Sequence, residues 1–250
     1  MFGIFSKTAA PSIDEVNKHI QFYNSLFADT KTSPPTILLP TAKYFPEQKG
    51  KKDRELVEYY TKIICRQFSL KSAIRIIPDK TLNNINIARK LPIIHKNNSR
   101  PSSFIRKNKN GYEIHYAPSL LKNPGVLVAE LSLHVCQIFC EINMAEKELT
   151  PSFLEYICIA YGLGVFIINM DNSFRSFNRS EALRWHSKVE QSMEENTTSG
   201  ASDSEETSFN HFILIAIHLK KSSSDTKEIA PFIEKRQFKF IAATSKLIET

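Results

Sequence analysis

Apolar residues recur at helical spacing in two neighbouring segments near the middle of the chain. In residues 125–142, apolar residues separated by three or four positions share one helical face: Val128, Leu131, Val135, Ile138, Phe139 and Ile142. Residues 152–169 are apolar on nearly all sides, which indicates burial. Neither segment reaches about 18 uninterrupted apolar residues. The pattern therefore predicts a pair of core helices rather than two membrane spans.

Two glycines lie inside the second of these helices, at Gly162 and Gly164. Each is expected to cost about 0.5–1 kcal/mol relative to alanine in a helix interior. Their presence predicts either a kink or a close approach of another helix at this point.

The residues before this pair have mixed helix and strand patterns. Ser12 and Glu15 have the spacing of a capping box, which predicts a helix that begins at residue 13. A second helix is expected at 53–68. Strands are expected at 36–39, 73–77 and 93–95, together with a hairpin of 103–106 and 112–116 that turns at Asn110-Gly111.

The residues after the pair are expected to be mainly helical. We expect an amphipathic helix at 180–195, a disordered loop at 196–208, a buried helix or strand at 209–219, a linker at 222–226 and a final helix at 228–248. The predicted fold class is α+β, with a small N-terminal sheet packed on a mainly helical core. We expect a single domain over 1–221 with a tail at 1–11, and a linker and C-terminal helix over 222–250 that pack on it.

Several short motifs resemble, in order, a family of bacterial zincin-like proteins. That family reads LVATLAHELAH on one helix and LTDLxxVFxGxGIFxAN on the next. The matching parts here are Leu127-Val128-Ala129, the run from Gly162 to Phe166 and Asn169. The segments Met1–Phe5 and Pro40–Pro46 also resemble the start of the family and its PTxxFFP motif. The resemblance implies a zincin-like helix pair at the centre of the fold.

The resemblance also implies that the zinc site has been lost. It puts Leu133 and Gln137 at the positions of the two zinc histidines, His134 at that of the general-base glutamate, and Tyr156 at that of the acidic ligand. A catalytic zinc needs three protein ligands and a carboxylate that accepts a proton from the bound water. Leucine cannot bind zinc, and a tyrosine with a pKa of about 10 is protonated at neutral pH. The interpretation is therefore a pseudo-enzyme with no catalytic residue and no cofactor.

Cysteine and histidine offer few other ligands. Cys136 and Cys140 are four residues apart on the first helix and Cys158 is on the second, so three thiols could meet a metal ion. Structural zinc sites close with four ligands, and helical cysteines commonly act as small apolar core residues. The only nearby partner expected for His134 is Glu130, one helical turn earlier. Four cysteines do not make a disulfide framework, which favours a cytoplasmic location.

Charge divides the chain into a basic and an acidic half. Residues 43–122 contain 18 Lys and Arg against 6 Asp and Glu, whereas residues 123–211 contain 5 against 13. The two halves could lie against each other or could contact a protein partner. The candidate partner-binding residues are Arg100, Arg106 and Lys107 in the basic half, and Glu194, Glu195, Asp203, Glu205 and Glu206 in the acidic half.

Three functions follow as hypotheses. The first is a catalytically inactive, metallopeptidase-like protein that binds another protein, one version of which is an inhibitor or immunity protein against a toxin. The second is a metal-dependent hydrolase with a non-standard site. The third is a nucleic-acid-binding protein that uses the basic residues 43–122, although no known nucleic-acid-binding motif accompanies them.

Overall fold

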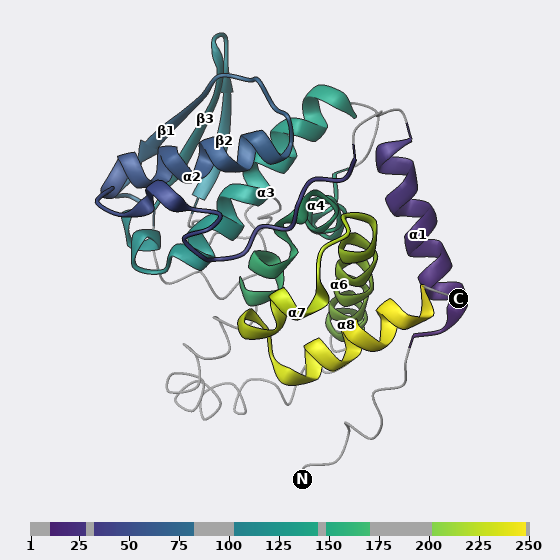
Figure 1. Cartoon of the computed structure of the whole chain (residues 1–250). Helices are drawn as coiled ribbons and strands as arrows, with labels where there is room; N and C mark the ends of the chain where they lie inside the picture. Colours follow the sequence, from purple (N-terminus) through teal and green to yellow (C-terminus); the bar gives the residue numbers. More distant parts are fainter. Residues whose placement is uncertain (1–10, 29–32, 83–102, 145–148, 171–201, 249–250) are drawn as a thin grey trace, which may run out of the picture.

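The computed structural model describes residues 11–28, 33–82, 103–144, 149–170 and 202–248, with the side chains described from residue 209 onward in the last range. The fold is α+β, as predicted: a small three-stranded sheet lies beside a mainly helical core (Figure 1). The strand expected at 93–95 and the helix expected at 180–195 lie outside the described residues.

Two N-terminal helices form where the sequence predicts them. Helix α1 spans Ile13–Phe27, and Ser12 and Glu15 form the expected capping box at its start. Helix α2 spans Asp53–Gln67, after a short 3₁₀ turn at Pro46–Gln48. Each helix buries one face in the common core.

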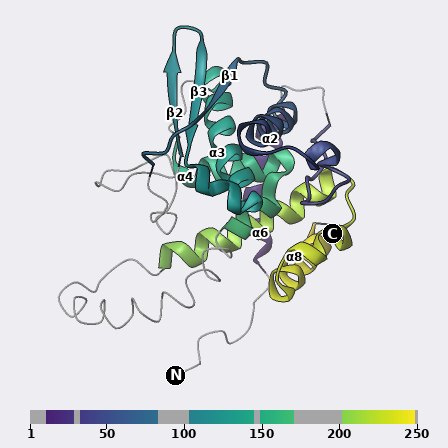
Figure 2. The same ribbon diagram turned by 90° about the vertical axis from the view of Figure 1, so that its left-hand side faces the viewer.

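The sheet has the strand order β1-β3-β2, so β3 is the central strand. Strand β1 (Ile74–Pro78) is parallel to β3 (Gly111–Tyr116), and β2 (Ser103–Asn108) is antiparallel to it. The predicted hairpin is therefore confirmed, with Lys109 and Asn110 as its two turn residues. The tip of this hairpin projects beyond the helices (Figures 1 and 2).

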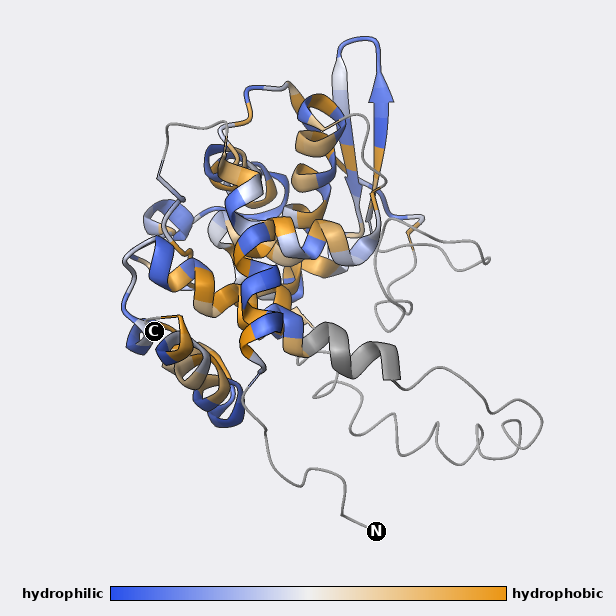
Figure 3. Ribbon diagram, turned by 90° about the vertical axis from the view of Figure 1, so that its right-hand side faces the viewer, coloured by the Kyte–Doolittle hydropathy of each residue, from blue (hydrophilic) through white to orange (hydrophobic). Residues whose placement is uncertain are grey.

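The predicted helix pair lies at the centre of the molecule. Helix α3 spans Pro124–Asn143, and α4 spans Pro151–Cys158 before the chain continues as a helix to Met170. Both helices are long and apolar enough to cross a membrane, but 78% and 83% of their apolar windows are buried inside the fold. Hydrophobic residues are concentrated on these central helices, whereas the hairpin tip is hydrophilic (Figure 3). The pair therefore packs as core helices.

Both expectations for the two glycines are met in the second central helix. A π-helix at Ile159–Leu163 contains a kink, where Gly162 has a positive φ of 83°. A Cβ at Gly162 would lie 2.6 Å from the carbonyl oxygen of Thr36, and a Cβ at Gly164 would lie 2.8 Å from Ile215. Gly162 thus permits the kink, and Gly164 permits the close approach of helix α6 (Ser202–Lys221).

The strand expected at 36–39 is wrong, because these residues pair with no strand among those described. The amide of Leu38 instead donates to the carbonyl of Gly162 at 2.8 Å. The buried side chains of Ile37, Leu38 and Leu39 explain why the sequence resembles a buried strand. The Gly162 carbonyl of the kinked helix thus accepts the hydrogen bond that a neighbouring strand would otherwise accept from Leu38.

The C-terminal part differs from its prediction in two places. Helix α6 spans Ser202–Lys221, so the last seven residues of the loop expected at 196–208 are helical, and the expected linker starts just after it. The single helix expected at 228–248 is divided into α7 (Thr226–Ile229), a 3₁₀ turn at Ala230–Phe232 and α8 (Lys235–Leu247). Pro231 accounts for the break, because proline lacks the amide that a helix interior requires. Phe240 packs on Phe209 and Phe212, which fixes α8 on α6.

Candidate functional site

The sheet and helix α3 meet at a buried cluster of Ser103, Glu130 and His134. The hydroxyl of Ser103, at the start of β2, donates to Glu130 Oε2 at 2.6 Å. His134 Nε2 lies 2.7 Å from the same Ser103 Oγ. Glu130 and His134 are one turn apart on α3, so a single serine caps both side chains.

This cluster has the residue types of a nucleophilic triad, but its hydrogen bonds are arranged differently. In such a triad the histidine accepts the serine proton, and the carboxylate contacts the other ring nitrogen. Here Ser103 donates its only proton to Glu130, so Ser103 accepts from the Nε2–H of His134. All three residues are buried, and burial lowers the pKa of His134 to about 3. The cluster therefore joins the sheet to the core and leaves a neutral histidine inside it.

The structure gives internal partners to the residues at the two expected zinc-histidine positions. Leu133 is fully buried in the hydrophobic core. Gln137 is partly buried and donates from its amide to Glu141 Oε1 at 3.0 Å. An aliphatic side chain and an amide that is already hydrogen-bonded are poor replacements for two imidazoles.

The position given to Tyr156 requires a correction. In the family pattern the acidic residue precedes the first glycine by seven positions, and seven positions before Gly162 is Glu155, not Tyr156. Tyr156 is half-buried and contacts the rings of Phe22 and His211. By this count the resemblance puts a carboxylate, Glu155, at the expected acidic position, whereas it puts Leu133 and Gln137 at the two expected histidine positions.

Glu155 is buried beside His211, which comes from helix α6. Glu155 Oε2 lies 3.0 Å from His211 Nε2, although that nitrogen lacks a well-directed hydrogen bond. No sequence pattern indicates this pair, because the two residues belong to helices separated by a long connection. The contact links α4 to α6.

The three cysteines of the helix pair do lie together in the core. Burial raises the pKa of Cys136, whose thiol also contacts those of Cys140 and Cys158. All three are free and buried, and Cys158 Sγ lies 3.4 Å from the carbonyl oxygen of Ser132. Within the described parts of the chain, no three His, Cys, Asp or Glu residues form a group that could hold a metal ion. The thiols thus pack as apolar groups where α3 meets α4.

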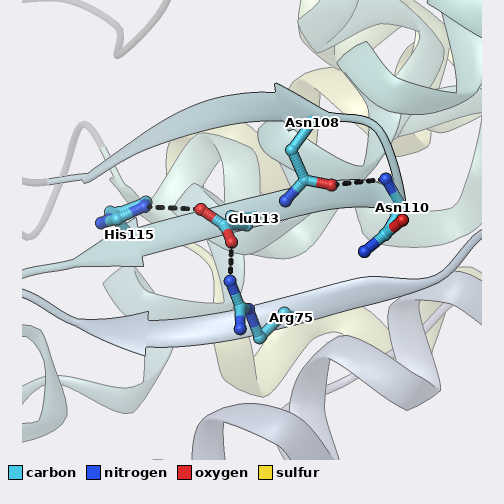
Figure 4. A network of polar contacts seen from close by, with 5 residues as sticks. All are labelled: Arg75, Asn108, Asn110, Glu113 and His115. Carbon is cyan, nitrogen blue, oxygen red and sulfur yellow. Dashed lines mark hydrogen bonds and ion pairs between the residues drawn. The ribbon is translucent and has the colours of Figure 1, made fainter.

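A second polar network lies on the sheet (Figure 4). Glu113 on β3 accepts from Arg75 on β1, and this guanidinium holds the pKa of Glu113 below its usual range. His115 Nε2 lies 3.4 Å from Glu113 and its ring stacks on Phe104 of β2 with centroids 4.5 Å apart. These residues fix the three strands to one another.

The structure places only some of the candidate partner-binding residues. Arg106 and Lys107 are exposed on β2, and as successive residues of a strand they point to opposite faces of the sheet. Asp203, Glu205 and Glu206 are in the first turns of α6, and their side chains lie outside what the structure describes. Arg100, Glu194 and Glu195 are outside the described residues altogether.

An open surface pocket of about 630 Å³ lies between α2 and the turn that precedes it. Its lining includes Lys62 and Arg66 on α2, with Tyr44 from the turn. The cations of this pocket are partly neutralised, since Lys51 pairs with Glu55 at 3.2 Å. The pocket is far from the helix-pair positions in sequence and shares no residue with them.

No family model matches the chain, and neither the curated proteins nor the solved structures contain a match.

Sequence reasoning missed Ser103 as the partner of His134 and missed the pair of Glu155 with His211. The i, i+4 spacing of Glu130 and His134 was visible, but Ser103 lies 27 residues before Glu130 and only strand placement brings it close. A polar residue at the first position of a strand was the one available signal.

Proposed function

We propose that this chain is a non-catalytic protein-binding module built on a zincin-like helix pair. The observation that supports the proposal is the state of four positions on that pair. Leu133 is core, His134 is bound to Ser103, Gln137 is bound to Glu141, and Glu155 contacts His211. Each position has an internal partner, so the packing of the pair does not depend on a metal ion.

The proposal includes the narrower version of an inhibitor or immunity protein. A fold whose described residues form no catalytic arrangement can act by covering the surface of another protein. The test is affinity capture of the tagged full chain from its native cell, followed by the intact mass of the complex. A protein partner in whole-number stoichiometry supports the proposal. Recovery of the chain alone, under conditions that preserve known complexes of that cell, contradicts it.

A second candidate function, a metal-dependent hydrolase with a non-standard site, is favoured by one contact. Glu155 and His211 are buried, 3.0 Å apart, and of the types that bind zinc. Two ligands are fewer than the three that a catalytic zinc requires. Zinc bound to purified protein and lost in Glu155→Gln would establish this function in place of the first.

A further inference from the structure

We propose that the edge of strand β2 that faces away from β3 binds an acidic, extended segment of the partner protein, which adds to the sheet as a fourth strand. The inference rests on the proposed protein-binding function and names the surface and the chemistry of the partner. Strand β2 is at the edge of the sheet, since it pairs only with β3 among the described residues.

The main chain of β2 offers hydrogen bonds along this edge. Asn108 and Gly111 flank the two-residue turn, so they form a hydrogen-bonded pair of the antiparallel ladder. Such pairs alternate, which leaves the amide and carbonyl of Ile105 and Lys107 directed away from β3. An extended segment can bind these groups in the way that peptides add to exposed sheet edges.

The positive charges of β2 favour an added segment with negatively charged side chains. Residues 106–110 are all exposed and include the cations Arg106, Lys107 and Lys109 with no anion. Arg106 and Lys107 point to opposite faces, so an added strand meets positive charge on both faces. Opposite charges on neighbouring strands stabilise a pair, by about 0.2–1 kcal/mol each. A segment with Asp or Glu at successive positions therefore fits this edge.

The hairpin is already held in its binding conformation. The backbone amide of Asn110 donates to Asn108 Oδ1 at 2.9 Å, and the backbone amide of Tyr112 donates to the Ala73 carbonyl at 3.0 Å. Gly111, with φ of 132°, lies so close to Ala73 that a Cβ would be 2.5 Å from its carbonyl oxygen. A segment that binds a preorganised edge orders few additional residues.

Two other occupants fit the edge less well. A second copy of the chain would place the same cations opposite one another, which is destabilising. Single-stranded nucleic acid requires open aromatic faces on which bases stack. The nearby rings are covered, since Phe104 stacks on His115 and Tyr112 is only 6% exposed.

The first experiment measures binding of a synthetic peptide of about 12 residues, in which pairs of successive Glu residues alternate with pairs of Val so that both faces of the strand carry Glu, to the full chain by fluorescence anisotropy at low salt. The variant R106E/K107E is compared with the matched control K62E/R66E, which makes the same charge change on exposed residues of α2. We expect wild-type binding that weakens by roughly tenfold or more in R106E/K107E and by less than about twofold in the control. Hydrogen exchange should show protection of the Ile105 and Lys107 amides by the peptide.

Three results would overturn the proposal: no binding of the peptide to the wild-type chain, equal loss in both variants, or tighter binding of a thymidine oligonucleotide of matched length. Self-association that competes with the peptide would assign the edge to a second copy instead. Thermal unfolding of both variants establishes that each is folded.

Capture from the native cell separates this inference from the proposed function. If wild-type chain and K62E/R66E recover a partner that R106E/K107E does not, both proposals are supported. If all three recover it, the chain binds a protein through another surface, and only the β2 inference fails. If none recovers a partner, the proposed function fails, and the inference fails with it.

Discussion

The Nε2 atom of His134 lies 2.7 Å from the hydroxyl oxygen of Ser103, and both side chains are 1% exposed. This contact joins the first residue of β2 to the middle of α3. It also gives the histidine at the expected general-base position a structural partner, because the same hydroxyl donates to Glu130. The cluster should therefore affect stability, and several measurements can test this.

Replacement of Ser103 by alanine should destabilise the fold. The change leaves Glu130 Oε2 and His134 Nε2 without the hydroxyl that they share, and a buried polar group that loses its partner costs about 1–3 kcal/mol. Urea unfolding measures the difference. Ser25→Ala is the matched control, since Ser25 is exposed and donates only to the nearby Phe22 carbonyl at 2.7 Å. Equal stability of the Ser103→Ala variant and the wild type would show that the cluster does not join sheet and core.

Stability should fall as the solution becomes acidic, because two histidines are buried in neutral form. Burial lowers the pKa of His134 to about 3 and that of His218 to about 4. Below the unfolded value of about 6.5, the unfolded chain binds protons that the folded chain excludes. Each histidine should thus lower the free energy of unfolding by about 1.4 kcal/mol per pH unit as the pH falls from 6.5 toward the pKa of that histidine in the folded state. Above pH 6.5 neither histidine should make the free energy of unfolding depend on pH.

The measurement is the free energy of unfolding from urea curves between pH 4.5 and 8. His134→Gln should reduce the slope below pH 6.5, even if it lowers stability at neutral pH. His19→Gln, at a half-exposed histidine of α1, is the control. An unchanged slope in His134→Gln would contradict the assignment of His134 as a buried neutral group.

Gly162→Ala should destabilise the protein, whereas the matched change Gly125→Ala should not. Gly162 has a φ of 83°, and an added Cβ would lie 2.6 Å from the Thr36 carbonyl oxygen. A non-glycine residue in such a conformation costs about 1–3 kcal/mol before the clash is counted. Gly125→Ala, where the nearest atom to the added Cβ is 3.5 Å away, should be neutral or stabilising. Thermal unfolding of the two variants compares them, and similar melting temperatures would be contrary to the kinked structure.

The cysteines should react slowly with a thiol reagent in the folded state. Burial raises the pKa of Cys136, and it raises that of Cys65 to about 11, so few reactive thiolates are present. At pH 8 the folded chain should react much more slowly than the chain in urea, where all four cysteines should react. Rapid reaction of several thiols in the folded state would show that the α3–α4 interface opens or differs from the structure.

Local patterns predicted the helices that have strong periodicity or good caps. Ser12 with Glu15 marks the start of α1, and the apolar positions of 125–142 mark α3. The hairpin follows from Asn110-Gly111, with the turn one residue earlier than expected. The two glycines of the second central helix predict a kink or a close contact, and the structure has a kink at Gly162 and a close contact of Gly164 with α6.

Residues that depend on distant partners were not predictable in this way. The segment 36–39 has the composition of a buried strand. The backbone amide of Leu38, however, donates to the carbonyl of Gly162 in a π-helix, and no local pattern predicts this π-helix. Residues 202–208 are polar and acidic, yet they form the first turns of α6. The later residues of α6 pack in the core. In the candidate site, Ser103 and His211 contact His134 and Glu155 only through the tertiary fold.

The central claim is that the α3–α4 pair is complete without a divalent cation. The most direct measurement is the zinc content, by mass spectrometry, of full-length protein purified from its native cell without chelators. We predict zinc far below one atom per chain and no change in melting temperature when zinc or a chelator is added. About one tightly bound zinc per chain, with a melting temperature that falls on chelation and a content that falls in Glu155→Gln, would contradict the claim.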